Sequence, residues 1–234
     1  MGSDMVSLED TTKRHYMWDL DPEYVEEMSQ EGYDPHMKLL VIAGEITEED
    51  YEFYVKAKVE GDIDEDKFDR LDKLRKKAKV TNYSALYGVG AAKLSRESGM
   101  SRSESSALLK AFWDLNWSIP KVSESQYKKE VGNEVWVKNP ISGFYYNLRF
   151  DKDTWSTINQ GTGVYIFDSW LARCRSRGYK GHWQFHDETG GYIKDRGATT
   201  KLMKDAVDQL NEDLDLNVTI GIDIKYGNNY AETH

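Results

Sequence analysis

The stretch from residue 64 to residue 87 constrains the fold most strongly, because it contains neither proline nor glycine. Gly88 follows directly, and glycine is the residue that most often ends a helix. We therefore expect one long helix over residues 64–87.

Four side chains recur at intervals of four residues within this predicted helix: Arg75, Lys79, Tyr83 and Tyr87. Four residues advance about 400° around a helix, so each side chain is displaced by only about 40° from the one before, and the four form one stripe. Two cations followed by aromatic rings suit a triphosphate and the base attached to it. The alternative interpretation is a basic amphipathic helix whose tyrosines belong to the core.

Charge is segregated along the chain. The formal net charge is −10, which argues against a uniform coating of nucleic acid. Residues 45–66 carry ten acidic side chains, whereas residues 67–79 carry seven basic and two acidic ones, a local balance of +5. The basic block can bind a polyanion, or it can be a solvated helix face.

Composition excludes several classes of protein. Cys174 is the only cysteine, so no intramolecular disulfide framework exists. The N-terminal residues lack the pattern of a secretory signal, and the longest apolar run, Leu39 to Ala43, is far shorter than the ~20 residues of a membrane helix. We expect a soluble protein of the reducing cytoplasm.

Local signals predict the other elements. Asp21-Pro22 and Asp34-Pro35 each pair an N-cap acceptor with a proline at the first helical position. Capping-box patterns at Thr47 and Ser101 predict helices over 48–59 and 102–115. Further helices are expected over 154–177, despite Gly161 and Gly163, and over 199–214. Strands are expected at 3–9, at 217–225, on both sides of a turn within 134–150, and on both sides of a turn within 182–193. Together these elements predict an α+β fold.

Carboxylates occur in two of the predicted strand regions. His186, Asp187 and Glu188 form the turn within 182–193, and Asp4 and Glu9 lie near the N-terminal strand. If the strand around Asp4 lies beside the strand entering Asp187, the two carboxylates converge and can hold Mg²⁺. Paired acids in a turn are more commonly just solvated.

The order of these motifs resembles the palm and fingers of family A DNA polymerases, the polymerase I and phage replicative group. The matching segments are Asp4…Glu9, Asp34-Pro35-His36, Arg75-x3-Lys79-x3-Tyr83-x3-Tyr87-Gly88, Gln160-Gly161-Thr162, Gln184-Phe185-His186-Asp187-Glu188 and Asn229-Tyr230…His234. The resemblance implies an antiparallel palm sheet that carries the motif A and motif C strands, with an inserted helical fingers subdomain. It divides the chain into an N-terminal palm segment (1–33), fingers (34–130, with the motif B helix at about 64–87) and a C-terminal palm segment (131–234).

By the same resemblance, two Mg²⁺ ions are bound by Asp4, the backbone carbonyl of Met5, and Asp187. The predicted catalytic residues are Asp4, Asp187, Glu188 and Lys79, with Lys79 as a proton donor to pyrophosphate. Glu9 closes the nucleotide pocket against a ribose 2′-hydroxyl. The remaining nucleotide contacts are His36, Arg75, Lys79 and Tyr83, and the DNA contacts are Tyr87, Gly88, Gln160, His186 and His234.

Some positions depart from the family pattern. Val6 replaces a small polar residue, Ser156 an asparagine, and Phe144 an arginine after Gly143. Because motif A begins at residue 4, the resemblance also implies a split polymerase, in which a separate polypeptide supplies the thumb, the rest of the palm and any exonuclease domain. The implied ligands are primer-template DNA and dNTP, in a bacterial or phage-infected host cytosol.

Two other interpretations stay open at this point. A single-subunit RNA polymerase shares the palm and the arginine, lysine and tyrosine spacing of motif B, although Glu9, Tyr83 and Glu188 match the DNA-polymerizing branch. A catalytically inactive scaffold remnant is the second alternative, against which the intact Asp4, Lys79 and Asp187 argue.

Overall fold

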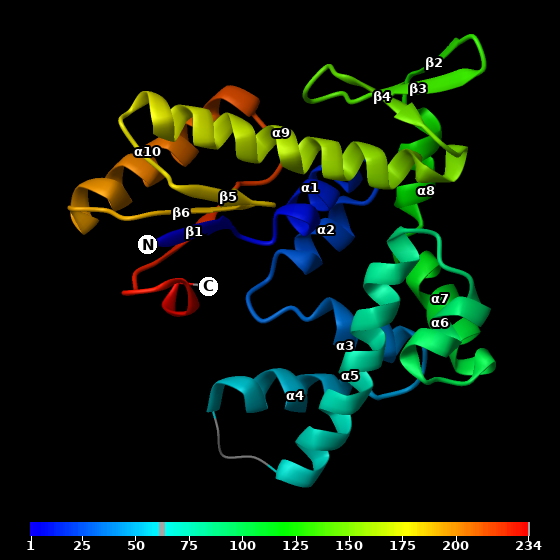
Figure 1. The fold of residues 1–234 in the computed structure, drawn as a ribbon. Coiled ribbons are helices and arrows are strands. Elements are labelled where there is room, and N and C mark those ends of the chain that lie inside the picture. The colour runs from blue at the N-terminus through cyan, green and yellow to red at the C-terminus, as the bar shows by residue number, and fades with distance from the viewer. Residues whose placement is uncertain (61–63, 234) are drawn as a thin grey trace. The chain divides into compact units, whose positions relative to one another are not determined.

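The computed structural model describes residues 1–60 and 64–233, and it confirms the α+β class (Figure 1). The chain forms two compact units. The sheet unit comprises Met1–Trp18, Gln126–Arg149 and the chain from Thr157 onward, and the helical unit comprises Asp19–Ser125 and Phe150–Ser156. The palm and fingers boundaries at 33/34 and 130/131 stay a prediction.

The sheet unit is built on a four-stranded antiparallel sheet with the strand order β5-β6-β1-β7. Its strands are β1 (Gly2–Met5), β5 (Trp183–Phe185), β6 (Glu188–Gly190) and β7 (Ile222–Lys225). Strand β1 is an inner strand and lies between β6 and β7, two strands from the far end of the sequence. Its pairing with β6 gives the arrangement of the Asp4 strand beside the Asp187 turn in which the two carboxylates can converge.

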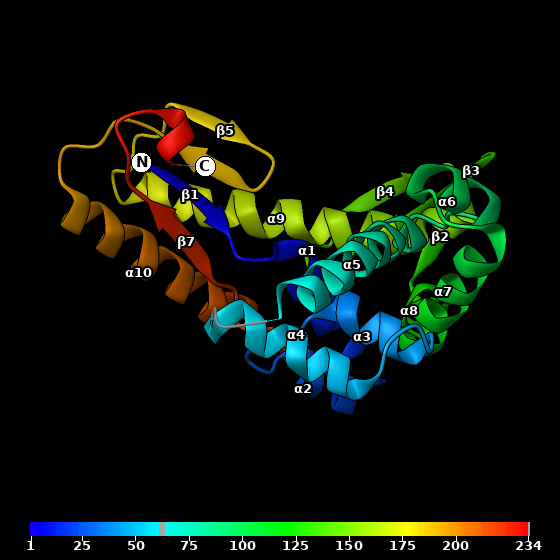
Figure 2. The same ribbon diagram turned by 90° about the horizontal axis from the view of Figure 1, so that it is seen from below.

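One face of this sheet packs on two long helices, α9 (Thr154–Ser176) and α10 (Arg196–Leu214) (Figure 1, Figure 2). Met5, Ile222 and Ile224 enter the same hydrophobic cluster as Trp170 and Leu210 of these helices. Since side chains alternate along a strand, Asp4 and its direct neighbours in the register belong to the opposite face.

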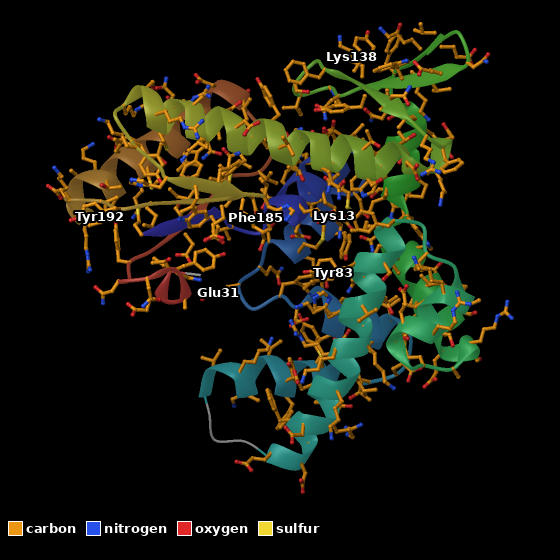
Figure 3. The ribbon with its side chains drawn as sticks, in the orientation of Figure 1. Lys13, Glu31, Tyr83, Lys138, Phe185 and Tyr192 are labelled. Atoms are coloured by element: carbon orange, nitrogen blue, oxygen red, sulfur yellow. The ribbon has the colours of Figure 1, made fainter. Side chains whose placement is uncertain are left out.

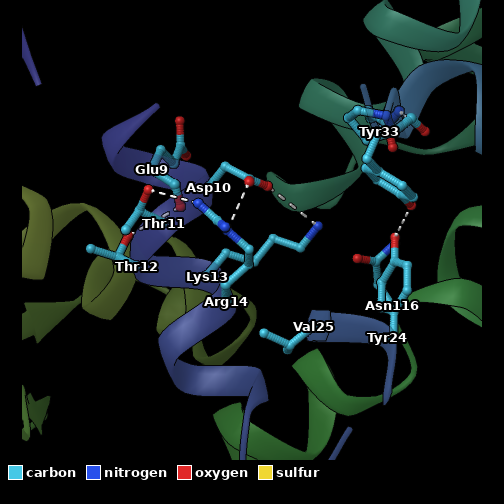
Figure 4. Close-up of polar contacts among 12 residues, drawn as sticks. Glu9, Asp10, Thr11, Thr12, Lys13, Arg14, Tyr24, Val25, Tyr33 and Asn116 are labelled. Carbon is cyan, nitrogen blue, oxygen red and sulfur yellow. Dashed lines mark hydrogen bonds and ion pairs between the residues drawn. The ribbon is translucent and has the colours of Figure 1, made fainter. Parts of the chain in front are cut away.

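The predicted strand over residues 3–9 is wrong in its second half. Strand β1 ends at Met5, Ser7 adopts a left-handed conformation with φ of 46°, and helix α1 (Leu8–Met17) begins directly afterwards. Glu9 therefore lies in the first turn of a helix. Within α1, Asp10 forms ion pairs with Arg14 at 3.3 Å and Lys13 at 3.9 Å, and Arg14 donates a hydrogen bond to Thr11 (Figure 4).

A second antiparallel sheet contains β2 (Lys128–Val131), β3 (Glu134–Lys138) and β4 (Tyr145–Leu148). Strands β3 and β4 are the predicted strand pair, whereas β2 was not predicted. Asn139 fixes the turn between β3 and β4, because its side-chain oxygen accepts from the backbone N–H groups of Ile141 and Ser142. Its amide also donates to the carbonyl of Ile158 on α9 at 2.9 Å, which ties this sheet to the helix.

The described part of the helical unit contains seven complete α-helices: α2 (Pro22–Met28), α3 (Pro35–Ile42), α4 (Glu48–Glu60), α5 (Glu65–Leu86), α6 (Ala91–Ser98), α7 (Arg102–Leu115) and α8 (Ser118–Ser125). Both capping pairs form as predicted, at Thr47 with Asp50 and at Ser101 with Glu104. Helices α6 and α8 were not predicted.

Helix α5 matches the long helix expected over 64–87. Asp64 caps its start, and Gly88 follows its end with a φ of 68° that glycine adopts at little cost. Leu71, Ala78 and Ala85 lie fully buried on one side of it and pack into the core of the helical unit. No helix in the described ranges is both long and apolar enough to cross a membrane.

The described residues of the acidic segment include helix α4, the cap of α5 and the first residues of α5. Asp50 of α4 pairs with Lys67 at 2.9 Å and with Arg70 at 3.7 Å, and Tyr54 donates to Asp72 of α5 at 2.7 Å. Part of the basic block is therefore paired with carboxylates of the same unit, while Arg70 stays exposed to solvent.

Candidate active site

An open cleft of about 430 Å³ lies in the sheet unit. It is lined by α1, α9 and the turn between β5 and β6, through Leu8, Glu9, Asn159, Gln160, Gly163, Val164, Phe167, His186 and Asp187. Three segments that the sequence predicts to act together thus meet at one surface depression. Among the predicted site residues, Glu9, Gln160, His186 and Asp187 line it directly.

Asp4 and Asp187 lie close together at the centre of the sheet unit. The backbone N–H of Met5 donates to the carbonyl oxygen of Asp187 at 3.2 Å. The pKa of Asp4 is raised, first by burial and then by the negative charges of Asp223 and Asp187, while Lys225 opposes the shift. A divalent cation would relieve this repulsion, because it stabilises both carboxylates in their charged forms.

The register places further carboxylates beside Asp4. Glu188 on β6 and Asp223 on β7 are its direct cross-strand neighbours, so the three residues share one face of the sheet. Glu188 is buried, and Asp223 is exposed. The described residues contain no group of three or more His, Cys, Asp or Glu side chains arranged to hold a metal ion. A metal ion bound here would have to be held by Asp4, Asp187 and backbone oxygens such as that of Met5.

The turn between β5 and β6 contains only His186 and Asp187, since Phe185 and Glu188 already pair with each other. The favoured two-residue turns of antiparallel strands place at least the first turn residue at positive φ, and His186 adopts a φ of 51°. The ring of His186 is exposed and lies 4.2 Å from that of Phe185. This tight turn presents His186 and Asp187 together at the cleft.

Asn159 positions Glu9, although Asn159 is not among the site residues predicted from the sequence. Its amide donates to the backbone carbonyl of Glu9 at 3.0 Å, and its oxygen accepts from the hydroxyl of Thr12 at 2.8 Å. Asn159 is almost completely buried, so these bonds fix the first turns of α1 against α9. The only available signal was its position next to Gln160. Asp223 was missed because only the strand register reveals it.

In the helical unit, the predicted stripe is present on α5. Tyr83 and Tyr87 are each about half exposed, so they are not core tyrosines. Tyr83 is labelled in Figure 3. The ammonium of Lys79 lies 6.0 Å from the centre of the Tyr83 ring, and the ring of His36 lies 5.9 Å from it. The helical unit therefore brings His36, Lys79 and Tyr83 together.

Asp34 connects three elements of the helical unit. It caps α3 by accepting from the backbone N–H groups of His36 and Met37, and it also accepts from Lys58 at 3.1 Å and Arg75 at 2.6 Å. Burial would raise the pKa of Asp34, but the hydrogen bonds from Arg75 and Lys58 outweigh it and lower the pKa. The sequence predicted Asp34 only as a helix cap.

His36 is buried and uncharged at neutral pH. Burial lowers its pKa to about 4, the cations of Arg75 and Lys79 add to the shift, and the carboxylate of Asp34 opposes it. Its Nδ1 lies 2.8 Å from the amide nitrogen of Asn82, and with Asn82 as donor the ring carries its proton on Nε2. His36 thus offers a neutral N–H donor, in contrast to the cations of the stripe.

The predicted residues fall into two groups. The sheet unit contains Asp4, Met5, Glu9, Gln160, His186, Asp187 and Glu188, and the helical unit contains His36, Arg75, Lys79, Tyr83, Tyr87 and Gly88. His234 lies outside the described residues.

Comparison with known proteins finds similarity of structure only. No family model matches the sequence, and no curated protein matches it. Among solved structures, the chain is similar to the POL domain of Pol1 from M. smegmatis, in complex with DNA primer-template and dNTP, with a TM-score of 0.60 and 13% sequence identity. The similarity covers 94% of this chain and 38% of that chain. Over nearly all of its length, the chain therefore has the fold of part of a polymerase POL domain.

Proposed function

We propose that this chain carries the nucleotidyl-transfer site of a template-directed DNA polymerase. The observation that carries the proposal is the juxtaposition of Asp4 on the central strand β1 with Asp187 in the turn that precedes the neighbouring strand β6, two aspartates from opposite ends of the sequence. The fold similarity to a POL domain supports it, because that domain was seen with DNA primer-template and dNTP.

In this proposal the 3′-hydroxyl of a primer gives up its proton to water, its oxygen attacks the α-phosphorus of a dNTP, and the bond from that phosphorus to the bridging oxygen breaks to release pyrophosphate. Asp4, Asp187 and the Met5 carbonyl would hold Mg²⁺. When bound there, Mg²⁺ lowers the pKa of the hydroxyl and stabilises charge on the leaving oxygen. Glu188, buried beside Asp4, supports the strand pairing that holds these ligands in place.

The stripe on α5 would bind the nucleotide. Lys79 has no ion pair among the described residues, so its ammonium is available for phosphate oxygens and for giving a proton to the leaving pyrophosphate. Arg75 uses its Nε for Asp34, which leaves its two Nη groups for a phosphate. His36 would contribute its neutral N–H, and Tyr83 its exposed ring for the base.

The remaining roles concern DNA and the sugar. Glu9 at the cleft would exclude a ribose 2′-hydroxyl, whereas Tyr87, Gly88, Gln160, His186 and His234 would contact primer and template. The chain aligns with 38% of the matched chain. We propose that a separate polypeptide supplies the complementary parts, including a basic surface for DNA that a protein of net charge −10 needs.

Primer extension tests the proposal. The native protein is isolated with the polypeptides that accompany it, and extension of a primed template is measured in Mg²⁺. Asp187→Asn should abolish extension without changing assembly, while Asp208→Asn, an exposed control on α10, should extend normally. Equal extension by both variants would contradict the proposed metal mechanism. Full activity of the isolated single chain would contradict the proposal of a separate partner polypeptide.

A further inference from the structure

The sheet formed by β2, β3 and β4 has one buried and one exposed face. Val137 and Leu148 are buried on the inner face. Tyr146 of the same face packs on α9 so closely that a Cβ at Gly161 would lie 2.9 Å from its ring. Alternation along the strands then assigns Tyr127, Lys129, Trp136, Lys138, Tyr145 and Asn147 to the outer face.

Aromatic and basic side chains alternate on this outer face in two adjacent rows. In the first row, Lys138 lies between Tyr127 and Tyr145, since its N–H donates to the Tyr127 carbonyl and its register partner on β4 is Tyr145. In the second row, Trp136 lies between Lys129 and Asn147. Each cation is thus adjacent to at least one ring.

The rings are accessible and in contact with one another. Tyr127 is 60% exposed and Tyr145 37% exposed, and their ring centres are 6.3 Å apart in an edge-to-face arrangement. The ammonium of Lys129 lies 3.7 Å from the centre of the Tyr145 ring. Large aromatic side chains are normally buried, so this exposed group indicates a binding surface.

The charge of this face favours a polyanion. Neither Lys129 nor Lys138 has a carboxylate partner among the described residues. Lys138 is also exposed to solvent (Figure 3). Among the paired residues of the three strands, Glu134 is the acidic residue on the outer face. Its carboxylate accepts a hydrogen bond from the indole of Trp136 at 3.2 Å. The face therefore offers aromatic rings together with unpaired cations.

We propose that this outer face, defined by Tyr127, Lys129, Trp136, Lys138 and Tyr145, binds single-stranded DNA. Unpaired bases stack on the tyrosine rings, which a duplex cannot do without opening, and the lysines contact the phosphates. A protein partner would not need unpaired cations in both rows. Binding of single-stranded nucleic acid to this face requires neither a metal ion nor catalytic activity. Only the choice of DNA over RNA rests on the proposed function.

Fluorescence anisotropy of a labelled oligothymidine of about 20 nucleotides tests this, with EDTA present and no dNTP. Tyr127→Ala and Tyr145→Ala should each weaken binding by about tenfold to a hundredfold. Tyr192→Ala, which removes a 79% exposed tyrosine elsewhere in the sheet unit, should leave binding unchanged. Lys129→Gln and Lys138→Gln should each reduce the salt dependence of binding, by a slope of about 0.7, whereas the exposed Lys204→Gln should not.

Several outcomes would overturn the proposal: equal affinities for the Tyr127, Tyr145 and Tyr192 variants, tighter binding of a matched hairpin duplex, or tighter binding of oligouridine. Circular dichroism of each variant confirms that the fold persists. Asp187→Asn should bind the oligonucleotide as the unmodified protein does, so failure of the catalytic proposal and failure of this one are distinguishable.

Discussion

Arg75 and Asp34 are joined by a hydrogen-bonded ion pair of 2.6 Å that links α5 to the first turn of α3. The carboxylate is nearly buried and is shared with Lys58 of α4. The predicted triphosphate arginine is therefore held in place before any nucleotide binds. This arrangement makes Asp34 a structural centre of the helical unit.

Asp34→Asn should lower the free energy of unfolding by about 3 kcal/mol, because it leaves two cations without their buried partner while keeping an oxygen for the helix cap. Urea denaturation measures the change. Asp114→Asn removes an exposed ion pair with Lys110 and should cost less than about 1 kcal/mol. Equal costs for the two variants would show that Asp34 does not have this role.

Acid should destabilise the protein through His36. Its pKa is about 4 in the folded protein and near 6.5 when unfolded, so the unfolded chain binds more protons between these values. The stability that comes from keeping the His36 ring neutral is fully present above pH 6.5. As the pH falls toward 4, the free energy of unfolding decreases by up to about 3 kcal/mol. Denaturant unfolding at pH 4.5 to 7 should show a flatter pH dependence for His36→Gln than for the unmodified protein. A control, His182→Gln at an exposed ring, should keep the original slope.

Two glycines on α9 should respond to alanine in opposite directions. At Gly161 a Cβ would lie 2.9 Å from the Tyr146 ring, whereas at Gly163 the nearest atoms, those of Leu8, are 3.5 Å away. Gly163→Ala should therefore stabilise the helix by about 1 kcal/mol, and Gly161→Ala should destabilise the protein by at least about 1 kcal/mol through overpacking. Thermal unfolding of the two variants checks the order, and the reverse order would contradict the packing described here.

Removal of the Glu9 side chain should weaken discrimination between sugars. Glu9 lines the cleft, and its backbone is fixed by Asn159, so the side chain occupies a defined place. If the proposed polymerase activity is present, Glu9→Ala should raise ribonucleotide incorporation by about tenfold relative to deoxynucleotide incorporation, a change of about 1.4 kcal/mol. Glu212→Ala, an exposed control on α10, should not change the ratio. An unchanged ratio for Glu9→Ala would exclude the role as a sugar filter.

Local sequence signals predicted most of the helices and failed where tertiary contacts decide. Helix α5 was predictable because its caps and its lack of breakers lie within the segment itself. Helix α1 was not, since its first turns contain Thr11 and Thr12, which favour strands, and are held by Asn159 of a distant helix. Strand β2 was missed because Lys128–Val131 is mostly charged and gains its structure by pairing with β3.

The candidate site was predictable as an ordered set of motifs, but not as a geometry. The spacing of Arg75, Lys79 and Tyr83 within one helix fixed their common face. In contrast, the ion pairs of Asp34 and the burial of His36 depend on how α3, α4 and α5 pack together. The place of Asp223 beside Asp4 likewise follows only from the strand register.

Within the part of the chain that the structure describes, strand β1 pairs with β6 and β7, segments that are translated more than 180 residues later. Such distant pairing carries a large entropy cost of chain closure and slows folding. Until β6 has been synthesised, Gly2–Met5 has no neighbouring strand to join, and its backbone must be kept from aberrant association by other means. Asp4 and Asp187 can therefore come together only after residue 190 has emerged from the ribosome, and β1 gains its second neighbouring strand only after residue 225.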